Sequence, residues 1–238
     1  MTKSGIVKMG MFLWILGIIL PQGTRSQVKE TVDYVNPFIG TEKSSHLTVW
    51  EARGATFPGV LLPFGMVQIT PDGYMYSDKR IKAFSFLNHN SGWSSHGSFR
   101  LMAFTGDVPG DGSAFRHQQE RATPYYYRVN LEDYGIDAEF TATGHAALCR
   151  FKFPESSSAH LLFSDVSEMK AVGNDQIRGR CGSYFFIASF SRTFQSAGVS
   201  VQQSASAPGQ KPSGYYIDFS TASGETVLVR IGFSMTSF

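Results

Sequence analysis

The segment between Asn88 and Phe99 concentrates side chains that could do chemistry. It reads NHNSGWSSHGSF, with two His, two Asn, four Ser and one Trp. So many polar groups would need hydrogen-bond partners in a core, so we expect an exposed loop. An indole ring stacks on the apolar face of a sugar, while amide and imidazole groups bond its hydroxyls. We therefore predict a sugar-binding loop that uses Trp93, Asn88, His89 and His96; the alternative is that Trp93 only packs over the edge of the domain.

Other catalytic patterns are weak. His46, His89 and His96 show neither HxH nor HExxH spacing, so we predict no metal site. There is no G-x-S-x-G elbow for a serine hydrolase and no phosphate-binding glycine loop. Glycoside hydrolysis needs two carboxylates at a defined separation, and the sequence reveals no such pair among its scattered acids. These acids include Asp72, Asp78, Asp165 and Glu168.

Short alternating runs must position these side chains. Cys149, Phe151 and Phe153 alternate with basic residues, and residues 227–233 repeat this period of two. Ten or more such runs are separated by turn sequences such as PDG and ASG, without a convincing amphipathic helix. We predict an all-β fold, an antiparallel β-sandwich, in a single domain over residues 27–238.

Composition limits the class of protein. The 238 residues are 42% apolar and 17% charged, enough to bury one sizeable core, and twenty Phe with ten Tyr favour strands. Lys3, Lys8 and Arg25 are the only charged side chains among the first 26 residues, so the rest carries 18 basic and 19 acidic ones. That balance offers no basic surface for nucleic acid or anionic lipid, and we expect neither as a partner.

Residues 1–26 resemble an export signal. Two lysines precede the twelve-residue apolar run Met9–Leu20, which Pro21 closes. A membrane-spanning helix needs about twenty apolar residues, so the run suits a cleaved signal peptide better than an anchor. We expect a mature chain from near Gln27 that is secreted, periplasmic or on the cell surface. Export would permit a disulfide between Cys149 and Cys181, although two separate buried thiols fit the strand-like sequence equally well.

Several longer phrases carry a family resemblance. These are DYVNPFIGT (Asp33–Thr41), GATFPGVLLPFGMVQITPD (Gly54–Asp72), YSDKRIKAFSF (Tyr76–Phe86) and the block Ala122–Pro154, which contains YYYRVNLEDYGI. Together with the final strand VLVRIGFSMTSF, they resemble the N-terminal domain of glycoside hydrolase family 92, the calcium-dependent exo-α-mannosidases abundant in Bacteroidetes. The resemblance covers essentially the whole mature chain.

The resemblance implies a galactose-mutarotase-like supersandwich whose loops line a substrate pocket, with Trp93 as the best candidate contact. It also implies that the catalytic carboxylates and calcium ligands belong to a helical (α/α)-barrel domain that these 238 residues do not include. We therefore expect no catalytic residue, no metal and no cofactor in this chain.

Three functions follow from this reading. The first is the substrate-pocket domain of a secreted exo-α-mannosidase that acts on mannose-containing glycans, inactive without its catalytic domain. The second is a stand-alone carbohydrate-binding module. The third is a non-functional fragment whose exposed interface would make it aggregate. A separate catalytic (α/α) domain is the partner that the first function requires.

Overall fold

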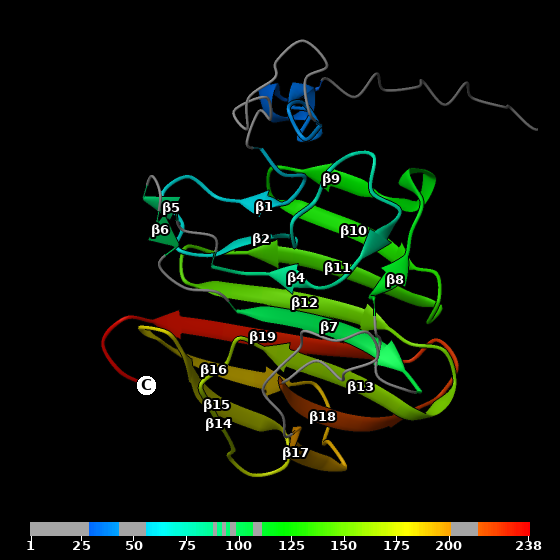
Figure 1. Cartoon of the computed structure of the whole chain (residues 1–238), viewed down its shortest axis with the longest axis vertical. Coiled ribbons are helices and arrows are strands. Elements are labelled where there is room, and N and C mark those ends of the chain that lie inside the picture. Colours follow the sequence, from blue (N-terminus) through cyan, green and yellow to red (C-terminus); the bar gives the residue numbers. More distant parts are fainter. Residues whose placement is uncertain are drawn as a thin grey trace, which may run out of the picture.

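The computed structural model describes residues 29–42, 56–87, 99–106, 111–197 and 214–238, and the backbone alone of 90–91, 94–95 and 198–200. Two antiparallel sheets face one another (Figure 1). The seven-stranded sheet has the order β1 (Val60–Leu61), β2 (Gln68–Pro71), β4 (Phe84–Ser85), β7 (Arg100–Thr105), β13 (Ser156–Ser164), β18 (Gly214–Thr221), β17 (Ser196–Ser200). The eight-stranded sheet has the order β14 (Glu168–Ala171), β15 (Gln176–Cys181), β16 (Tyr184–Phe190), β19 (Thr226–Ser234), β12 (Ala146–Lys152), β11 (Ile136–Ala142), β10 (Tyr126–Leu131), β9 (Arg121–Thr123).

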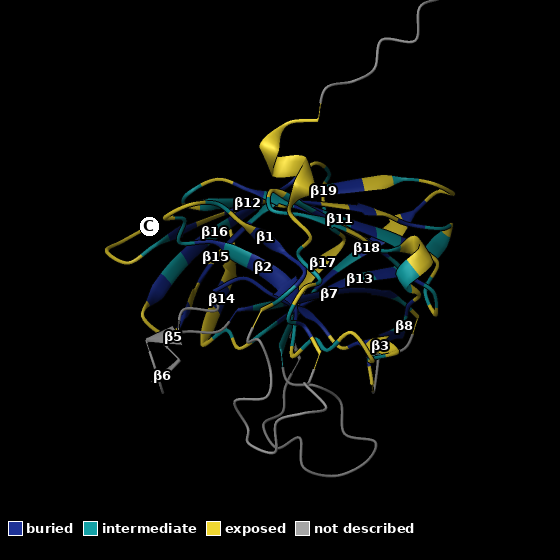
Figure 2. Cartoon of the chain, turned by 90° about the horizontal axis from the view of Figure 1, so that it is seen from above, coloured by how far each residue is buried: buried dark blue, intermediate teal, exposed yellow. Residues whose placement is uncertain are grey.

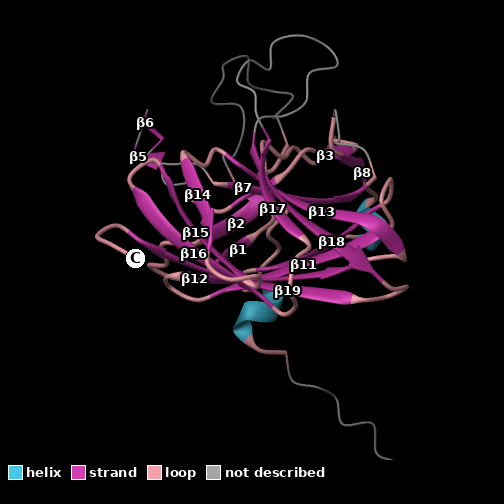
Figure 3. Ribbon diagram, turned by 90° about the horizontal axis from the view of Figure 1, so that it is seen from below, coloured by secondary structure: helices cyan, strands magenta, loops and turns pink. Residues whose placement is uncertain are grey.

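Smaller elements complete the described part of the chain. Two short ladders join β3 (Arg80–Ile81) to β8 (Ser113–Ala114) and β5 (Asn90–Ser91) to β6 (Ser94–Ser95). Within the described ranges, helical structure is limited to two 3₁₀ turns, η1 (Thr31–Tyr34) and η3 (His117–Gln119), and strands make up both layers (Figure 3). None of the helices in the described ranges is long and apolar enough to span a bilayer.

The alternation seen in the sequence matches the burial of the strands. In β12, Cys149 and Phe151 are buried while Arg150 and Lys152 are exposed. In β19 the buried positions are 227, 229, 231 and 233. Because successive side chains of a strand point to opposite faces, this pattern places one face of each strand between the sheets. Buried segments accordingly run along the strands (Figure 2), and the predicted antiparallel β-sandwich is confirmed.

Phe99 shows how the two layers are joined. Its ring contacts Phe86 and Phe163 on one side, with centroid distances of 5.4 and 5.8 Å, and Phe186 and Phe233 on the other, at 5.0 and 5.1 Å. All four pairs are edge-to-face, the arrangement that aromatic quadrupoles favour. The abundance of Phe in the sequence therefore serves an aromatic core between the sheets.

The final strand of the chain is internal to its sheet. β19 pairs with β12 on one side, in the register Cys149↔Val229, and with β16 on the other, in the register Phe190↔Val229. The same order separates the two cysteines, because β16 and β19 lie between β15, which holds Cys181, and β12, which holds Cys149. Adjacent strands are about 4.8 Å apart, so three such steps exceed the reach of a disulfide. Both cysteines are buried free thiols, which settles the choice left open above.

The N-terminal segment packs outside the two sheets. η1 lies beyond the end of the sandwich that carries β1 and β9 (Figure 1). Its first turn is closed by a capping box: the side chain of Glu30 accepts the backbone amide of Asp33, and the side chain of Asp33 accepts the backbone amide of Glu30. The predicted signal peptide, residues 1–26, lies outside the described residues, so its cleavage stays a prediction.

Candidate functional site

The sequence-predicted sugar contacts lie outside the described residues: Asn88, His89, Trp93 and His96. The chain on both sides of them is well defined. Leu87 and Phe99 are fully buried, and the amide of Phe86 donates a 3.0 Å hydrogen bond to the carbonyl of Phe99. The sugar-binding role of the four predicted contacts stays a prediction.

A pocket of about 220 Å³ opens where the N-terminal segment meets the end of β2. Its lining comes from four separate stretches of chain: Gly40, Thr41, Thr56, Phe57, Thr70, Pro71, Asp72, Gly73, Tyr74 and Ser85. Most of these residues belong to the blocks that carry the family resemblance. Hydroxyls, one carboxylate and aromatic rings therefore share one cavity.

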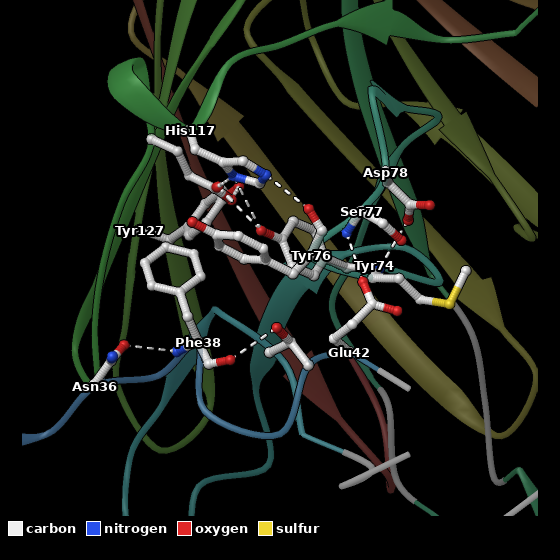
Figure 4. Close-up of polar contacts among 12 residues, drawn as sticks. Asn36, Phe38, Glu42, Tyr74, Tyr76, Ser77, Asp78, His117 and Tyr127 are labelled. Carbon is white, nitrogen blue, oxygen red and sulfur yellow. Dashed lines mark hydrogen bonds and ion pairs between the residues drawn. The ribbon is translucent and has the colours of Figure 1, made fainter. Parts of the chain in front are cut away.

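The turn at residues 36–41 forms one wall of the pocket. The Asn36 side chain accepts the amide of Phe38 at 3.0 Å, and the Thr41 hydroxyl donates to the Phe38 carbonyl at 2.8 Å (Figure 4). Gly40 closes the turn with a φ of 82°, in the left-handed region that glycine tolerates best. The hydroxyl of Thr56 holds the turn from the other side, since it donates to the carbonyl of Ile39 at 2.7 Å. The NPFIGT phrase is thus a hydrogen-bonded turn docked on the sandwich.

A buried carboxylate supports the opposite wall. The side chain of Glu120 is fully buried and accepts hydrogen bonds from the hydroxyls of Tyr127, at 2.6 Å, and Tyr74, at 3.1 Å. His117 Nδ1 lies 2.7 Å from the same carboxylate, and Nε2 lies 2.7 Å from the carbonyl oxygen of Tyr76 (Figure 4). A carbonyl oxygen only accepts, so Nε2 donates to Tyr76, and Nδ1 and the carboxyl group of Glu120 share a second hydrogen bond. Glu120 is therefore the centre of a hydrogen-bonded network that fixes Tyr74 in the pocket wall.

The two tyrosines of this network stay protonated. Burial, followed by the charge of Glu120 and the hydrogen bond to it, raises the pKa of Tyr127 well above its ordinary value. The same causes raise the pKa of Tyr74. Both phenols therefore act as hydrogen-bond donors to Glu120 at any physiological pH, and neither is a candidate general base.

The carboxylate of Asp72 is paired with Arg100. The Arg100 Nε atom is 3.1 Å from one oxygen of Asp72 and 3.1 Å from one oxygen of Asp165. Nε itself makes no hydrogen bond, so these are ion pairs whose oxygens lie off the N–H direction. Asp165 adopts a φ of 60°, a left-handed conformation that costs a non-glycine residue free energy. Arg100 thus holds the pocket carboxylate in place through a bridge between β2, β7 and β13.

The described lining of the pocket offers hydroxyl groups and one carboxylate. Asp72 is the one carboxylate among the described residues that line the pocket. Hydrolysis of a glycosidic bond with inversion uses an acid and a base about 6.5–9.5 Å apart on either side of the bond. In the part of the chain that the structure describes, no three His, Cys, Asp or Glu side chains converge to hold a metal ion.

Comparison with known proteins places the chain. The model of the glycosyl hydrolase family 92 N-terminal domain matches residues 34–234. The chain belongs to this family. A family 92 α-mannosidase from Bacteroides thetaiotaomicron, solved in complex with mannoimidazole, has a TM-score of 0.67 and 27% identity, covering 87% of this chain and 32% of the enzyme. A family 92 inverting mannosidase from the same species has a TM-score of 0.71 and 25% identity, covering 88% of this chain and 32% of that enzyme.

A curated relative agrees with the family 92 assignment. An uncharacterized secreted glycosidase from Arthroderma benhamiae is 27% identical over 167 residues, which make up 61% of this chain and 20% of the relative. The chain therefore spans a fifth of that relative and about a third of the solved family 92 enzymes. The family model that it matches is the model of the N-terminal domain.

The sequence analysis missed the residues that support the wall of the described pocket. His117 and Glu120 are three residues apart in a stretch that looks like an ordinary loop, and their partner Tyr74 lies more than forty residues away. The one signal in the sequence is the run of tyrosines at residues 125–127, which begins a strand-like segment. Of the acids singled out earlier, Asp72 and Asp165 are joined through Arg100, whereas the others have separate local partners. His46, the third histidine considered for a metal site, lies outside the described residues.

Proposed function

We propose that this domain forms one side of the sugar-binding pocket of a secreted family 92 exo-α-mannosidase that acts on mannose-containing glycans. The observation that carries the proposal is the pocket between the turn at residues 36–41 and the end of β2. The α-mannosidase that binds mannoimidazole supports it, because that enzyme contains a domain of the same fold at 27% identity.

The polarity of the pocket suits a sugar. The hydroxyls of Thr41, Thr56 and Thr70 each donate their proton to a backbone carbonyl, at 2.8, 2.7 and 3.1 Å. Their remaining lone pairs, like the carboxylate of Asp72, are acceptors. A sugar offers several hydroxyl protons at once, so a cavity lined mainly by acceptors favours it over a ligand that can only accept.

Catalysis needs more than these residues. Asp72 has no second carboxylate opposite it in the described pocket, and Arg100 holds it as an ion pair. We propose that the acid, the base and the calcium ion belong to a separate catalytic (α/α) domain, and that this chain alone does not hydrolyse mannosides. Residues 1–26 would direct the protein out of the cytoplasm, in keeping with the secreted relative.

Calorimetric titration of the purified chain with mannose and α-1,2-mannobiose tests the proposal. We expect weak binding, with a Kd of about a millimolar, since half a site leaves part of the ligand in water. Trp93→Ala and Asp72→Asn should each weaken it, whereas Glu155→Gln, which changes an exposed carboxylate outside the pocket lining, should not.

Two results would contradict the proposal. Release of mannose from mannobiose by the chain alone would show a complete active site within it. If Asp72→Asn binds mannose with the same affinity as the parent chain, the sugar does not bind in this pocket. The alternative function, a stand-alone carbohydrate-binding module, would be favoured by binding to polymeric mannan that is much tighter than binding to mannose, without any requirement for a catalytic domain.

A further inference from the structure

A second group of polar side chains lies on the seven-stranded sheet, outside the pocket lining. His160 on β13 is directly opposite Asp218 on β18, and Ser158 precedes it by two residues. Side chains two residues apart along a strand share a face. The Oγ of Ser158 lies 2.6 Å from Nε2 of His160, and Nδ1 of His160 lies 2.6 Å from Oδ1 of Asp218.

The hydrogen bonds of this group fix the position of each proton. A carboxylate only accepts, so Nδ1 of His160 carries the ring proton and donates it to Asp218. The lone pair of Nε2 then accepts the hydroxyl proton of Ser158. Ser196 on β17 donates to the second oxygen of Asp218, which keeps the carboxylate in line with the imidazole. This is the order of contacts in which a histidine can activate a serine as a nucleophile.

The surroundings of the group are apolar yet leave it within reach of solvent. The Phe104 ring stacks on the His160 ring, with centroids 4.9 Å apart, and is itself 1% exposed. Tyr216 and Tyr134 each contact Phe104 edge-on. The side chains of His160 and Asp218 are 18% and 33% exposed. Ser158, Tyr134 and Tyr216 are also partly exposed, so a small molecule could reach the hydroxyl of Ser158.

We infer that Ser158 is an activated nucleophile that takes an acyl group from carboxylic esters. Its Oγ attacks the carbonyl carbon while His160 Nε2 takes the hydroxyl proton. The bond from carbon to the leaving oxygen then breaks, and His160 returns the proton to that oxygen, which leaves as an alcohol. Water attacks the acyl-serine by the same route, releasing the carboxylic acid and restoring Ser158. Asp218 acts as a positioning residue through His160.

Covalent labelling of the purified chain tests this inference. An alkyl fluorophosphonate presents phosphorus to the serine and loses fluoride, leaving an adduct that peptide mass spectrometry locates. We expect the adduct on Ser158 and, with 4-nitrophenyl butyrate, release of 4-nitrophenolate. His160→Gln should slow both reactions roughly a hundredfold. Ser157→Ala, which removes the exposed neighbouring hydroxyl, is the matched control and should leave both unchanged.

A second pair of variants separates positioning from folding. Asp218→Asn should slow labelling, and Asp218→Glu, which restores the carboxylate, should recover part of the rate. Circular dichroism and the urea midpoint establish that each variant is folded. A folded chain that gains no adduct at Ser158, or one whose labelling rate is the same in His160→Gln, would overturn the inference.

Discussion

The imidazole of His117 lies parallel to the ring of Tyr76, with centroids 4.1 Å apart, and also donates to the Tyr76 backbone carbonyl. Tyr76 in turn contacts Phe38 edge-on at 5.9 Å. One residue thus links the buried Glu120 network to the turn at residues 36–41. The two walls of the pocket are therefore in contact through Tyr76. A substitution in the Glu120 network should shift the turn at residues 36–41.

Glu120→Gln tests the buried carboxyl group of this network. The amide replaces one carboxyl oxygen with an NH₂ group that faces three hydrogen-bond donors, so we expect the free energy of unfolding to fall by about 3 kcal/mol. Urea unfolding followed by tryptophan and tyrosine fluorescence measures it. Glu168→Gln changes a solvent-exposed carboxylate and should leave the midpoint in place. Equal midpoints for the two variants would mean that the hydrogen bonds to Glu120 do not stabilise the folded protein.

Alkaline pH should destabilise the fold through its thiols. Burial, with a smaller contribution from Asp165, raises the pKa of Cys181 from 9.0 to about 12, and burial raises that of Cys149 as well. Above pH 9 the unfolded chain loses these protons while the folded chain keeps them. The stabilisation is therefore complete below pH 9 and is lost as pH rises toward 12, at about 1.4 kcal/mol per pH unit for each thiol.

Urea titrations at pH 8, 9 and 10 measure this slope, and Cys181→Ala should reduce it by the share of one thiol. Iodoacetamide offers a second test, because neither buried thiol should react in the native chain at pH 8, while both should react in urea. Rapid native alkylation, or a mass that changes by two protons on reduction, would contradict buried free thiols.

Two glycines with the same backbone conformation should respond differently to a methyl group. Gly73 and Gly112 have φ values of 67° and 71°. An added Cβ at Gly73 meets nothing within 4 Å, whereas at Gly112 it would lie 2.0 Å from the carbonyl oxygen of Ile81. We expect Gly73→Ala to cost about 1 kcal/mol and Gly112→Ala about 3 kcal/mol or more in unfolding free energy. If urea unfolding gives the same loss of free energy for both variants, β3 must shift to make room for the methyl group at residue 112.

The acceptor-lined pocket can be tested one hydroxyl at a time. Thr56→Val keeps the shape of the side chain but removes both its lone pairs and its bond to Ile39, so mannose binding by calorimetry should weaken several-fold. Thr193→Val changes an exposed threonine outside the pocket lining and should bind like the parent. If both variants bind equally well, the threonine hydroxyls do not contact the sugar.

Local patterns predicted the strands but not their partners. The alternation around Cys149 and around Val229 indicates two half-buried strands, and both form. Their direct pairing joins residues eighty positions apart, and nothing in a two-residue period specifies such a partner. The same limit hid the Glu120 network, because its donors come from three separate parts of the chain. The sequence shows that Glu120 is an acidic residue, but whether its carboxyl group is buried depends on tertiary packing.

The central place of β19 in its sheet bears on how the protein is made. Until residues 226–234 are available, β9–β12 and β14–β16 remain two half-sheets with bare, apolar edges. A nascent chain can therefore complete this layer only after nearly all of the domain has been synthesised. A stop codon before Thr226 would leave both half-sheets with unpaired edges, so we expect the shortened chain to aggregate and not to fold as a smaller domain.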